Sequence, residues 1–298
     1  MWTRECFVLV CFTVWCSARP DSAMTGFGME VLLTKLNILQ DHLEEIEQKT
    51  RLRESNQEKI ESARDINMQA KLDQLENKLN RIVPYSSCKE IPTNVSGIYD
   101  IQFGSNKTRL SVYCVQKAFG GGWILFQDRY YGKVNFNRNW NDYRDGFGDL
   151  KYEFWLGLKH LHQLTSERPH ELIVQVKDFN GNYGYAHYDQ FMIGSESEGY
   201  SLKIGNYKGT AGDALKFHNN MKFSTKDKDN DLGESQNCAL NLQGGWWFNH
   251  CSYSHLNGIY GKNKDWQGKY QVKEMHWYQL KNDWRSMSYS RMMIRELD

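Results

Sequence analysis

An acidic run ahead of a cysteine is the part of this sequence with the clearest chemistry. Carboxylates alternate along the segment at Asp227, Asp229 and Asp231, and Cys238 follows. Alternating carboxylates in an irregular, glycine-containing segment can converge on Ca²⁺, which takes about six to eight oxygen ligands. The alternative is a solvated acidic turn without a metal. The run is not an EF-hand, because Leu232 replaces the turn glycine of that loop and Cys238 replaces its bidentate Glu.

The first residues have the pattern of a secretory signal. A basic residue precedes the apolar run Cys6–Cys16, and small side chains end the segment at Ala18. We therefore predict a signal peptide at 1–18, a linker at 19–28 and a secreted, extracellular protein. The alternative is a retained signal anchor, but the apolar run is shorter than the roughly 20 residues that span a bilayer, and no other run reaches that length.

The cysteines that remain after removal of the signal predict disulfides. Of the seven cysteines in the chain, only Cys88, Cys114, Cys238 and Cys251 lie beyond it. Sequence alone allows three pairings, and the nearest-neighbour set Cys88–Cys114 and Cys238–Cys251 is the simplest and the one we predict. Zinc binding is the competing use, which the lack of a C-x-x-C spacing disfavours. Asn94 and Asn106 begin glycosylation sequons, as expected of a secreted protein.

The segment 29–83 predicts a coiled-coil helix. It has no Gly or Pro, and apolar residues recur in a 4-3 pattern in two sets that are out of phase, so a skip, break or loosened region is expected between them. A helix with such a seam needs partner chains, and leucine at both core positions fits a homo-oligomer of two or three chains. The alternative is a helix folded back on the globular domain. The two sets are Leu32, Leu36, Leu39, Leu43, Ile46 and Met68, Leu72, Leu75, Leu79, Ile82.

Pro84 ends the helix, and a domain of different composition follows at 85–298. It holds almost all of the 10 Trp, 17 Tyr and 14 Phe of the chain, and short strand-like runs such as Trp123–Gln127 and Leu172–Val176 alternate with Gly- and Asn-rich turns. From Lys208 onward the sequence reads as long irregular loops. A net charge of +1 gives no indication of nucleic-acid binding. No nucleophile, metalloprotease or phosphate-binding motif is present, so we predict that the chain is not an enzyme.

Several motifs occur in the order that is typical of one family, the fibrinogen C-terminal (fibrinogen-related) domain. The chain resembles that family over about residues 86–298, and its layout resembles secreted invertebrate fibrinogen-related lectins and ficolin-like or angiopoietin-like proteins. The motifs are Gly120–Trp123, Phe136–Trp140, Gly146–Gly148, Glu153–Leu158, Phe223–Thr225, Asn237–Ala239, Gly245–Trp247 and His255–Gly258.

The resemblance implies an α+β domain with a central antiparallel sheet and a loop-rich subdomain that binds calcium and ligand. It favours the calcium interpretation of the acidic run. Asp229 and Asp231 would supply side-chain oxygens to calcium, and the backbone carbonyls of Gly233 and Ser235 are the expected remaining donors.

The resemblance also places a ligand pocket around the second cysteine of the later pair, with a cis peptide bond at His250–Cys251. Ser252 stands where lectin members have a His, and Leu242 stands where an aromatic residue is usual. Both departures weaken the expectation of N-acetyl specificity. The residues expected at the pocket are Leu242, His250, Cys251, Ser252, Tyr253, Tyr270, Trp277 and Trp284.

Two functions are consistent with these features. The first is a secreted, calcium-binding pattern-recognition lectin of innate immunity that binds acetylated or sugar ligands on microbial surfaces, with avidity supplied by the coiled coil. The alternative is a non-lectin extracellular ligand that binds a receptor or a clotting-type protein partner.

Overall fold

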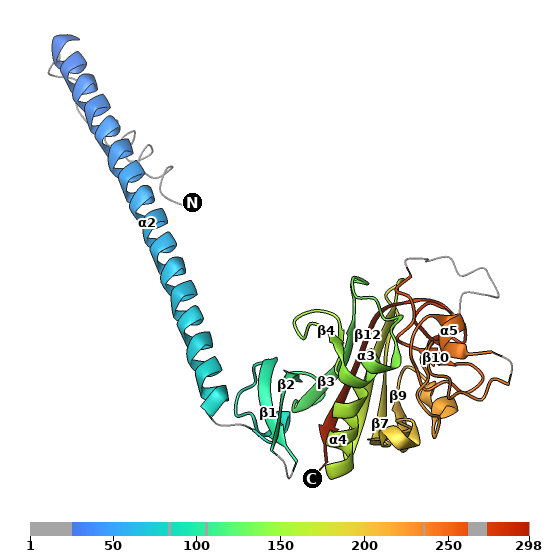
Figure 1. Ribbon diagram of the computed structural model, residues 1–298. Helices are drawn as coiled ribbons and strands as arrows, with labels where there is room; N and C mark the ends of the chain where they lie inside the picture. The colour runs from blue at the N-terminus through green and yellow to red at the C-terminus, as the bar shows by residue number, and fades with distance from the viewer. Residues whose placement is uncertain (1–25, 83–84, 105–106, 235, 262–272, 298) are drawn as a thin grey trace. The chain divides into compact units, whose positions relative to one another are not determined.

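A computed structural model describes residues 26–82, 85–104, 107–234, 236–261 and 273–297 (Figure 1). The predicted signal peptide at 1–18 and most of the predicted linker at 19–28 lie outside the described residues. Contacts divide the chain into two compact units between Gln74 and Leu75.

The described part of the N-terminal unit is one long helix, α2 (Gly26–Ile82), which continues past Gln74 and covers nearly all of the predicted range 29–83. The helix continues without interruption through the middle region where the two apolar sets lose phase, so no break is present there. Exposed ion pairs one turn apart add support, with Lys49 Nζ 2.6 Å from Glu45 Oε1. The apolar seam is uncovered in the single chain, since Leu36 and Leu39 are 59% and 62% exposed. None of the described helices is long and apolar enough to cross a membrane.

The globular unit is built on a ten-stranded sheet in which every strand pair is antiparallel. Its main path runs β1-β2-β3-β12-β6-β7-β8, with β4, β5 and β9 attached at the side. The strands are β1 (Gly97–Phe103), β2 (Thr108–Val115), β3 (Trp123–Arg129), β4 (Phe147–Gly148), β5 (Phe154–Trp155), β6 (His170–Asp178), β7 (Tyr183–Ile193), β8 (Leu202–Ile204), β9 (Tyr207–Gly209) and β12 (Met287–Glu296).

The strand β12 lies in the middle of the sheet, between β3 and β6. The expectation of long irregular loops from Lys208 to the C-terminus is wrong for this segment. Met292, Met293 and Ile294 are consecutive and fully buried, so the strand lacks the alternation of apolar and polar residues that marks a half-exposed strand. A centre strand buried on both faces has no such period.

Helices cover part of the sheet and frame the loops. In Figure 1, α4 (Leu158–Glu167) lies along the sheet, where it buries Leu158, Leu161 and Leu164 from one face of the helix. The remaining helical segments are α3 (Trp140–Asp145), α5 (Cys238–Leu242) and the short turns η1 (Cys88–Glu90), η2 (Glu196–Glu198), η3 (Leu215–His218) and η4 (Tyr278–Leu280). A second small sheet pairs β10 (Ser254–His255) with β11 (His276–Trp277).

Aromatic side chains form the core that joins the sheet to the C-terminal loops. The Trp155 and Trp247 rings lie 6.0 Å apart, and the Phe223 ring lies 5.2 Å from Trp247. The adjacent tryptophans Trp246 and Trp247 are both fully buried. They therefore hold the loops to the sheet and are not exposed for ligand contact.

Candidate functional site

The acidic loop is attached to the rest of the domain through its first carboxylate. Asp227 Oδ1 accepts a hydrogen bond from the Trp140 N–H at 2.9 Å and one from the Thr225 hydroxyl at 2.7 Å. The Trp140 N–H belongs to the first turn of α3, so its donation fixes the start of the loop against that helix.

The next two carboxylates lie together further along the loop. Asp229 Oδ1 accepts from the Asp231 N–H at 3.2 Å, while Asp231 accepts from the N–H groups of Gly233 and Cys238, both at 2.8 Å. Burial and then the neighbouring Asp229 raise the pKa of Asp231 above its usual range. Two carboxylates this close repel one another, and a cation between them would remove that cost.

The donor set around these carboxylates consists of oxygens, which suits calcium. A Cβ built on Gly233 would lie 2.9 Å from both Asp231 Oδ1 and the Gln236 carbonyl oxygen, so the loop turns these two oxygens toward the same small space. The predicted donor Ser235 lies outside the described residues. Within the described parts of the sequence no three His, Cys, Asp or Glu side chains form a metal cluster, so a cation here would depend on backbone carbonyls.

A disulfide joins the acidic loop to the segment that follows it. Cys238 is bonded to Cys251, and Cys88 is bonded to Cys114, which is the nearest-neighbour pairing predicted from the sequence. The Leu232 N–H donates to the Asn249 carbonyl at 3.0 Å, a second tie between the same two segments. The peptide bond at His250–Cys251 is cis, as the family resemblance implied.

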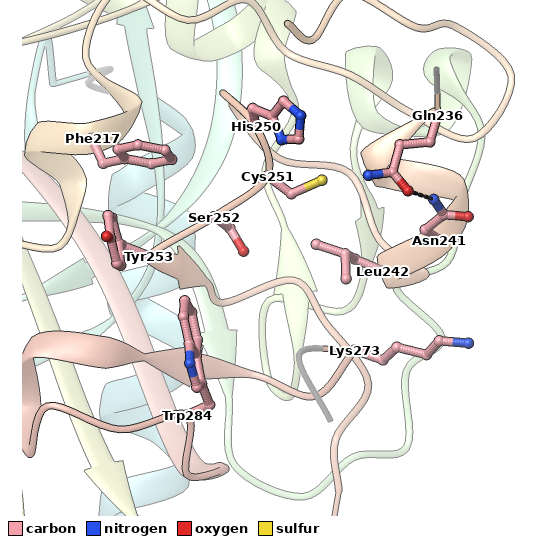
Figure 2. Close-up of a pocket in the computed structure, with 10 residues that line it drawn as sticks. All are labelled: Phe217, Gln236, Asn241, Leu242, His250, Cys251, Ser252, Tyr253, Lys273 and Trp284. Carbon is pink, nitrogen blue, oxygen red and sulfur yellow. Dashed lines mark hydrogen bonds between the residues drawn. The ribbon is translucent and has the colours of Figure 1, made fainter. Parts of the chain in front are cut away.

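Beside this disulfide lies a cavity of about 590 Å³. Figure 2 shows Tyr253, Trp284 and Phe217 on one side, Gln236, Asn241 and Leu242 on the other, and Cys251 and Ser252 between them. The predicted residues Leu242, His250, Cys251, Ser252, Tyr253 and Trp284 all line it.

One of the residues predicted at the cavity is not found there, and another lies outside the described residues. Trp277 is fully buried, and its indole N–H donates to the Ala211 and Gly212 carbonyls at 3.1 Å. Its expected place in the pocket is therefore wrong, because β11 turns the ring into the core. Tyr270 lies outside the described residues.

Four lining residues were missed by the sequence reasoning: Phe217, Gln236, Asn241 and Lys273. Phe217 lies on η3, which the irregular sequence from Lys208 onward did not indicate. Asn241 lies on α5 one position before Leu242, which was predicted, so the local helix could have suggested it. No feature of the sequence could have placed Lys273 at the cavity, because its position depends on how a separate loop folds back toward Cys251.

One wall of the cavity is aromatic. The Tyr253 ring lies 4.7 Å from the Phe217 ring, edge to face, and 5.9 Å from the Trp284 ring with the two planes nearly parallel. Tyr253 is 37% exposed, so part of its ring faces solvent. Lys273 and His250 are the basic groups among the described residues that line the cavity, and no carboxylate is among them. The site therefore suits an apolar group next to a neutral or anionic one.

Buried histidines support this wall from behind. His218 Nε2 accepts from the N–H groups of Tyr253 and Ser254 at 3.1 Å, and its Nδ1 lies 2.7 Å from the Trp247 carbonyl oxygen. Nδ1 therefore carries the proton and donates, while Nε2 must stay unprotonated to accept. Burial lowers the pKa of His218 to about 3, so the ring is neutral at physiological pH.

Only one of the two predicted glycosylation sites lies within the described residues. Asn94 is exposed, between η1 and β1. Asn106 lies outside the described residues.

Comparison with known proteins matches residues 86–297 to a family model, that of the C-terminal globular domain of the fibrinogen beta and gamma chains. Chicken tenascin-R is 42% identical over 67% of this chain and 14% of its own length, and mouse angiopoietin-related protein 6 is 41% identical over 67% of this chain and 43% of its own length. The chain thus spans less than half of these relatives.

Solved structures show the same fold. The fibrinogen-like globe domain of human ANGPTL6 is 40% identical, with a TM-score of 0.68 over 72% of this chain and 97% of that one. A lamprey fibrin D-dimer, solved with the peptide ligand Gly-His-Arg-Pro-amide, is 27% identical, with a TM-score of 0.65 over 91% of this chain and 96% of that one.

These relatives are extracellular and are not enzymes, which confirms the prediction that the chain is not an enzyme. The predicted α+β fold with its antiparallel sheet is confirmed as well. Domains of this kind bind extracellular ligands. The chain belongs to the family of fibrinogen C-terminal globular domains.

Proposed function

We propose that the chain is a secreted, oligomeric recognition protein that binds a protein partner through the cavity around Cys251. The observation that carries the proposal is the aromatic wall of Phe217, Tyr253 and Trp284 beside Lys273. Tyrosine and tryptophan in a partly desolvated pocket are typical of the anchoring points of protein interfaces.

The relatives support a protein partner over the microbial lectin that the sequence also suggested. Angiopoietin-related protein 6 and tenascin-R match the chain at 41–42% identity. The lamprey fibrin relative was solved with a peptide ligand, so a protein with this domain accepts a peptide segment. In this chain the partner segment would carry an apolar side chain for the aromatic wall and an acidic group for Lys273.

Calcium has a supporting role in this proposal. Asp229 and Asp231 would hold the ion together with backbone carbonyls from the turn at Gly233. The Gln236 carbonyl is added to the expected donors Gly233 and Ser235, because it faces the same space as Asp231 Oδ1. The bound ion would neutralise the two carboxylates and order the loop. Because Cys238 belongs to this loop and Cys251 lines the cavity, ordering one would order the other.

The long helix supplies multivalency. Its seam is uncovered in the single chain, with Leu36, Leu39 and Leu43 each at least 59% exposed, and a second copy or two would bury it. Linked domains that reach one surface together bind more tightly than a single domain by a factor of about 10²–10⁴.

Binding of the full-length protein to cultured cells, measured by flow cytometry, tests the proposal. Protease treatment of the cells should abolish binding, and enzymatic removal of glycans should leave it. Tyr253→Ala should weaken binding, whereas Tyr152→Ala, which truncates a tyrosine that is 64% exposed and outside the cavity, should not. Binding that survives protease but is lost with the glycans, or a positive signal for acetylated sugars on a glycan array, would favour the lectin instead.

A further inference from the structure

A second cavity lies beside the loop that follows β3, and none of its lining residues lines the cavity around Cys251. Its volume is about 310 Å³, at the lower end of the range for small-ligand sites. The lining residues that matter here are Arg129, Lys133, Asn135, Asn137, Gln243 and Tyr260.

The base of this cavity holds a buried arginine whose donors are only partly used. Arg129 is 1% exposed. Its Nη1 donates to the Gly258 carbonyl at 3.0 Å and the Leu256 carbonyl at 3.3 Å, but Nε has no hydrogen-bond partner in the part of the protein that the structure describes. Nε is itself closed off from solvent, and Cζ lies 3.8 Å from the centre of the Phe136 ring, so an anionic group would reach the guanidinium through the edge that lines the cavity.

The nearby carboxylate of Glu153 is an ion-pair partner of Arg129 but does not hydrogen-bond it. Glu153 Oε1 lies 4.0 Å from Arg129 Nε, beyond hydrogen-bond distance. The two oxygens of Glu153 instead accept five backbone N–H groups, from residues 130–134. Burial lowers the pKa of Arg129 to about 10, which leaves it charged at neutral pH. Glu153 therefore offsets the buried charge of Arg129 without hydrogen-bonding it, so the guanidinium keeps donors for a second anionic group.

The rim of the cavity adds a second cation and free amides. Lys133 is exposed, and no carboxylate is among the described residues that line the cavity. No described residue hydrogen-bonds the side-chain amides of Asn137 or Gln243. Each such amide can both donate and accept, which is the pattern that neighbouring hydroxyl groups require.

From this arrangement we propose that the cavity binds an anionic saccharide, with a sulfate or carboxylate between Arg129 and Lys133 and hydroxyl groups at the amides of Asn137 and Gln243. A guanidinium pairs with either anion through charge-assisted hydrogen bonds. A peptide backbone carries N–H and C=O groups that can pair with the same amides, so an acidic peptide is the competing ligand and is included as a probe. The site does not depend on the function proposed for the cavity around Cys251.

Isothermal titration of the full-length protein tests this site. The probes are a heparan sulfate tetrasaccharide, a hyaluronan tetrasaccharide that carries carboxylates alone, neutral cellotetraose and tetraglutamate. At least one anionic tetrasaccharide should bind, in a salt-sensitive manner, while cellotetraose and tetraglutamate should not. The two anionic probes distinguish a sulfate from a carboxylate.

Matched variants locate the binding. Lys133→Glu should weaken it by about tenfold or more, as expected for loss of one charge-assisted hydrogen bond. Lys151→Glu, which makes the same charge change at an exposed lysine outside the cavity, should leave it unchanged. Gln243→Ala should also weaken it. Equal effects of the two lysine changes, tighter binding of tetraglutamate, or no binding of either anionic saccharide would overturn the proposal.

Discussion

The backbone N–H of Cys238 donates to Asp231 Oδ2 at 2.8 Å, so the acidic loop is hydrogen-bonded directly to the first residue of α5. The same cysteine is disulfide-bonded to Cys251, which lines the cavity. A carboxylate proposed to hold calcium is thus one hydrogen bond and one disulfide away from the recognition surface. Changes that order the loop should therefore order the cavity.

The calcium proposal predicts one site per protomer that depends on Asp231. Calcium at about 100 times its dissociation constant should stabilise the folded protein by about 2.7 kcal/mol. Asp231→Asn should abolish both the heat of calcium binding and this stabilisation. Asp149→Asn, in a turn between β4 and β5, is the control and should retain both. Unchanged calcium binding in Asp231→Asn would refute the assignment.

The oligomer proposal predicts that the seam of α2 holds the protomers together. Leu39→Asp with Leu43→Asp places charges on the seam and should yield monomers by light scattering, with a loss of helical circular dichroism. Leu52→Asp changes a residue that is 64% exposed and off the seam, so it should leave the oligomer intact. A monomeric wild-type protein would contradict the proposal.

Glu153 should contribute to stability at neutral pH and lose that contribution in acid. Burial alone would raise its pKa, but the backbone N–H groups of Gly132, Tyr131, Tyr130 and Val134 outweigh burial and lower the pKa below 4.5. A lowered folded-state pKa gives stability above pH 4.5 that is lost as the pH falls through the folded value.

Replacement of this carboxylate tests the contribution. Glu153→Gln should reduce the unfolding free energy at pH 7 by about 3–5 kcal/mol, because Arg129 then loses its buried counter-charge. It should also flatten the dependence of stability on pH below 4.5. Glu167→Gln, at an exposed position, is the control. A Glu153→Gln protein as stable as wild type would contradict the role.

His218 should make the domain less stable in mild acid. A histidine paired with a carboxylate would instead add stability as the pH falls. Burial lowers its pKa from 6.5 to about 3, so the unfolded protein takes up the proton first. The contribution of neutral His218 to the unfolding free energy is complete above pH 6.5, and it falls by about 1.4 kcal/mol per pH unit as the pH drops toward 3. His276, with a pKa lowered to about 4 by burial, acts in the same direction.

Denaturant unfolding between pH 7 and pH 4.5 measures this effect. His218→Gln should have a shallower loss of stability with acid than wild type, by about 1.4 kcal/mol per pH unit. His42→Gln, on the exposed surface of α2, should retain the wild-type slope. Identical slopes in wild type and His218→Gln would show that the buried ring does not resist protonation.

The parts of the fold that could be predicted are those whose pattern is local. The 4-3 spacing along 29–83 marks the helix, and an even set of cysteines in an oxidising compartment marks the disulfides. The strand β12 could not be predicted, since the consecutive residues Met292 and Met293 are both buried and give no alternation of apolar and polar positions. The same limit applies to single aromatics, because composition does not show that Tyr253 faces the cavity while Trp277 faces the core.

The cavity shows the same contrast between local and distant contributions. Residues next to Cys251 could be predicted because they adjoin it in the sequence. Phe217 and Lys273 could not, because their positions are set by how separate loops return to the aromatic wall.

Amide hydrogen exchange of the segment His250–Ser254, with and without calcium, tests the coupling of loop to cavity most directly. The structure predicts that calcium slows exchange there in wild type and in Asp149→Asn, and leaves it unchanged in Asp231→Asn. If calcium binds to the wild-type protein and exchange in this segment stays the same, the acidic loop and the cavity are not coupled, which contradicts the proposal.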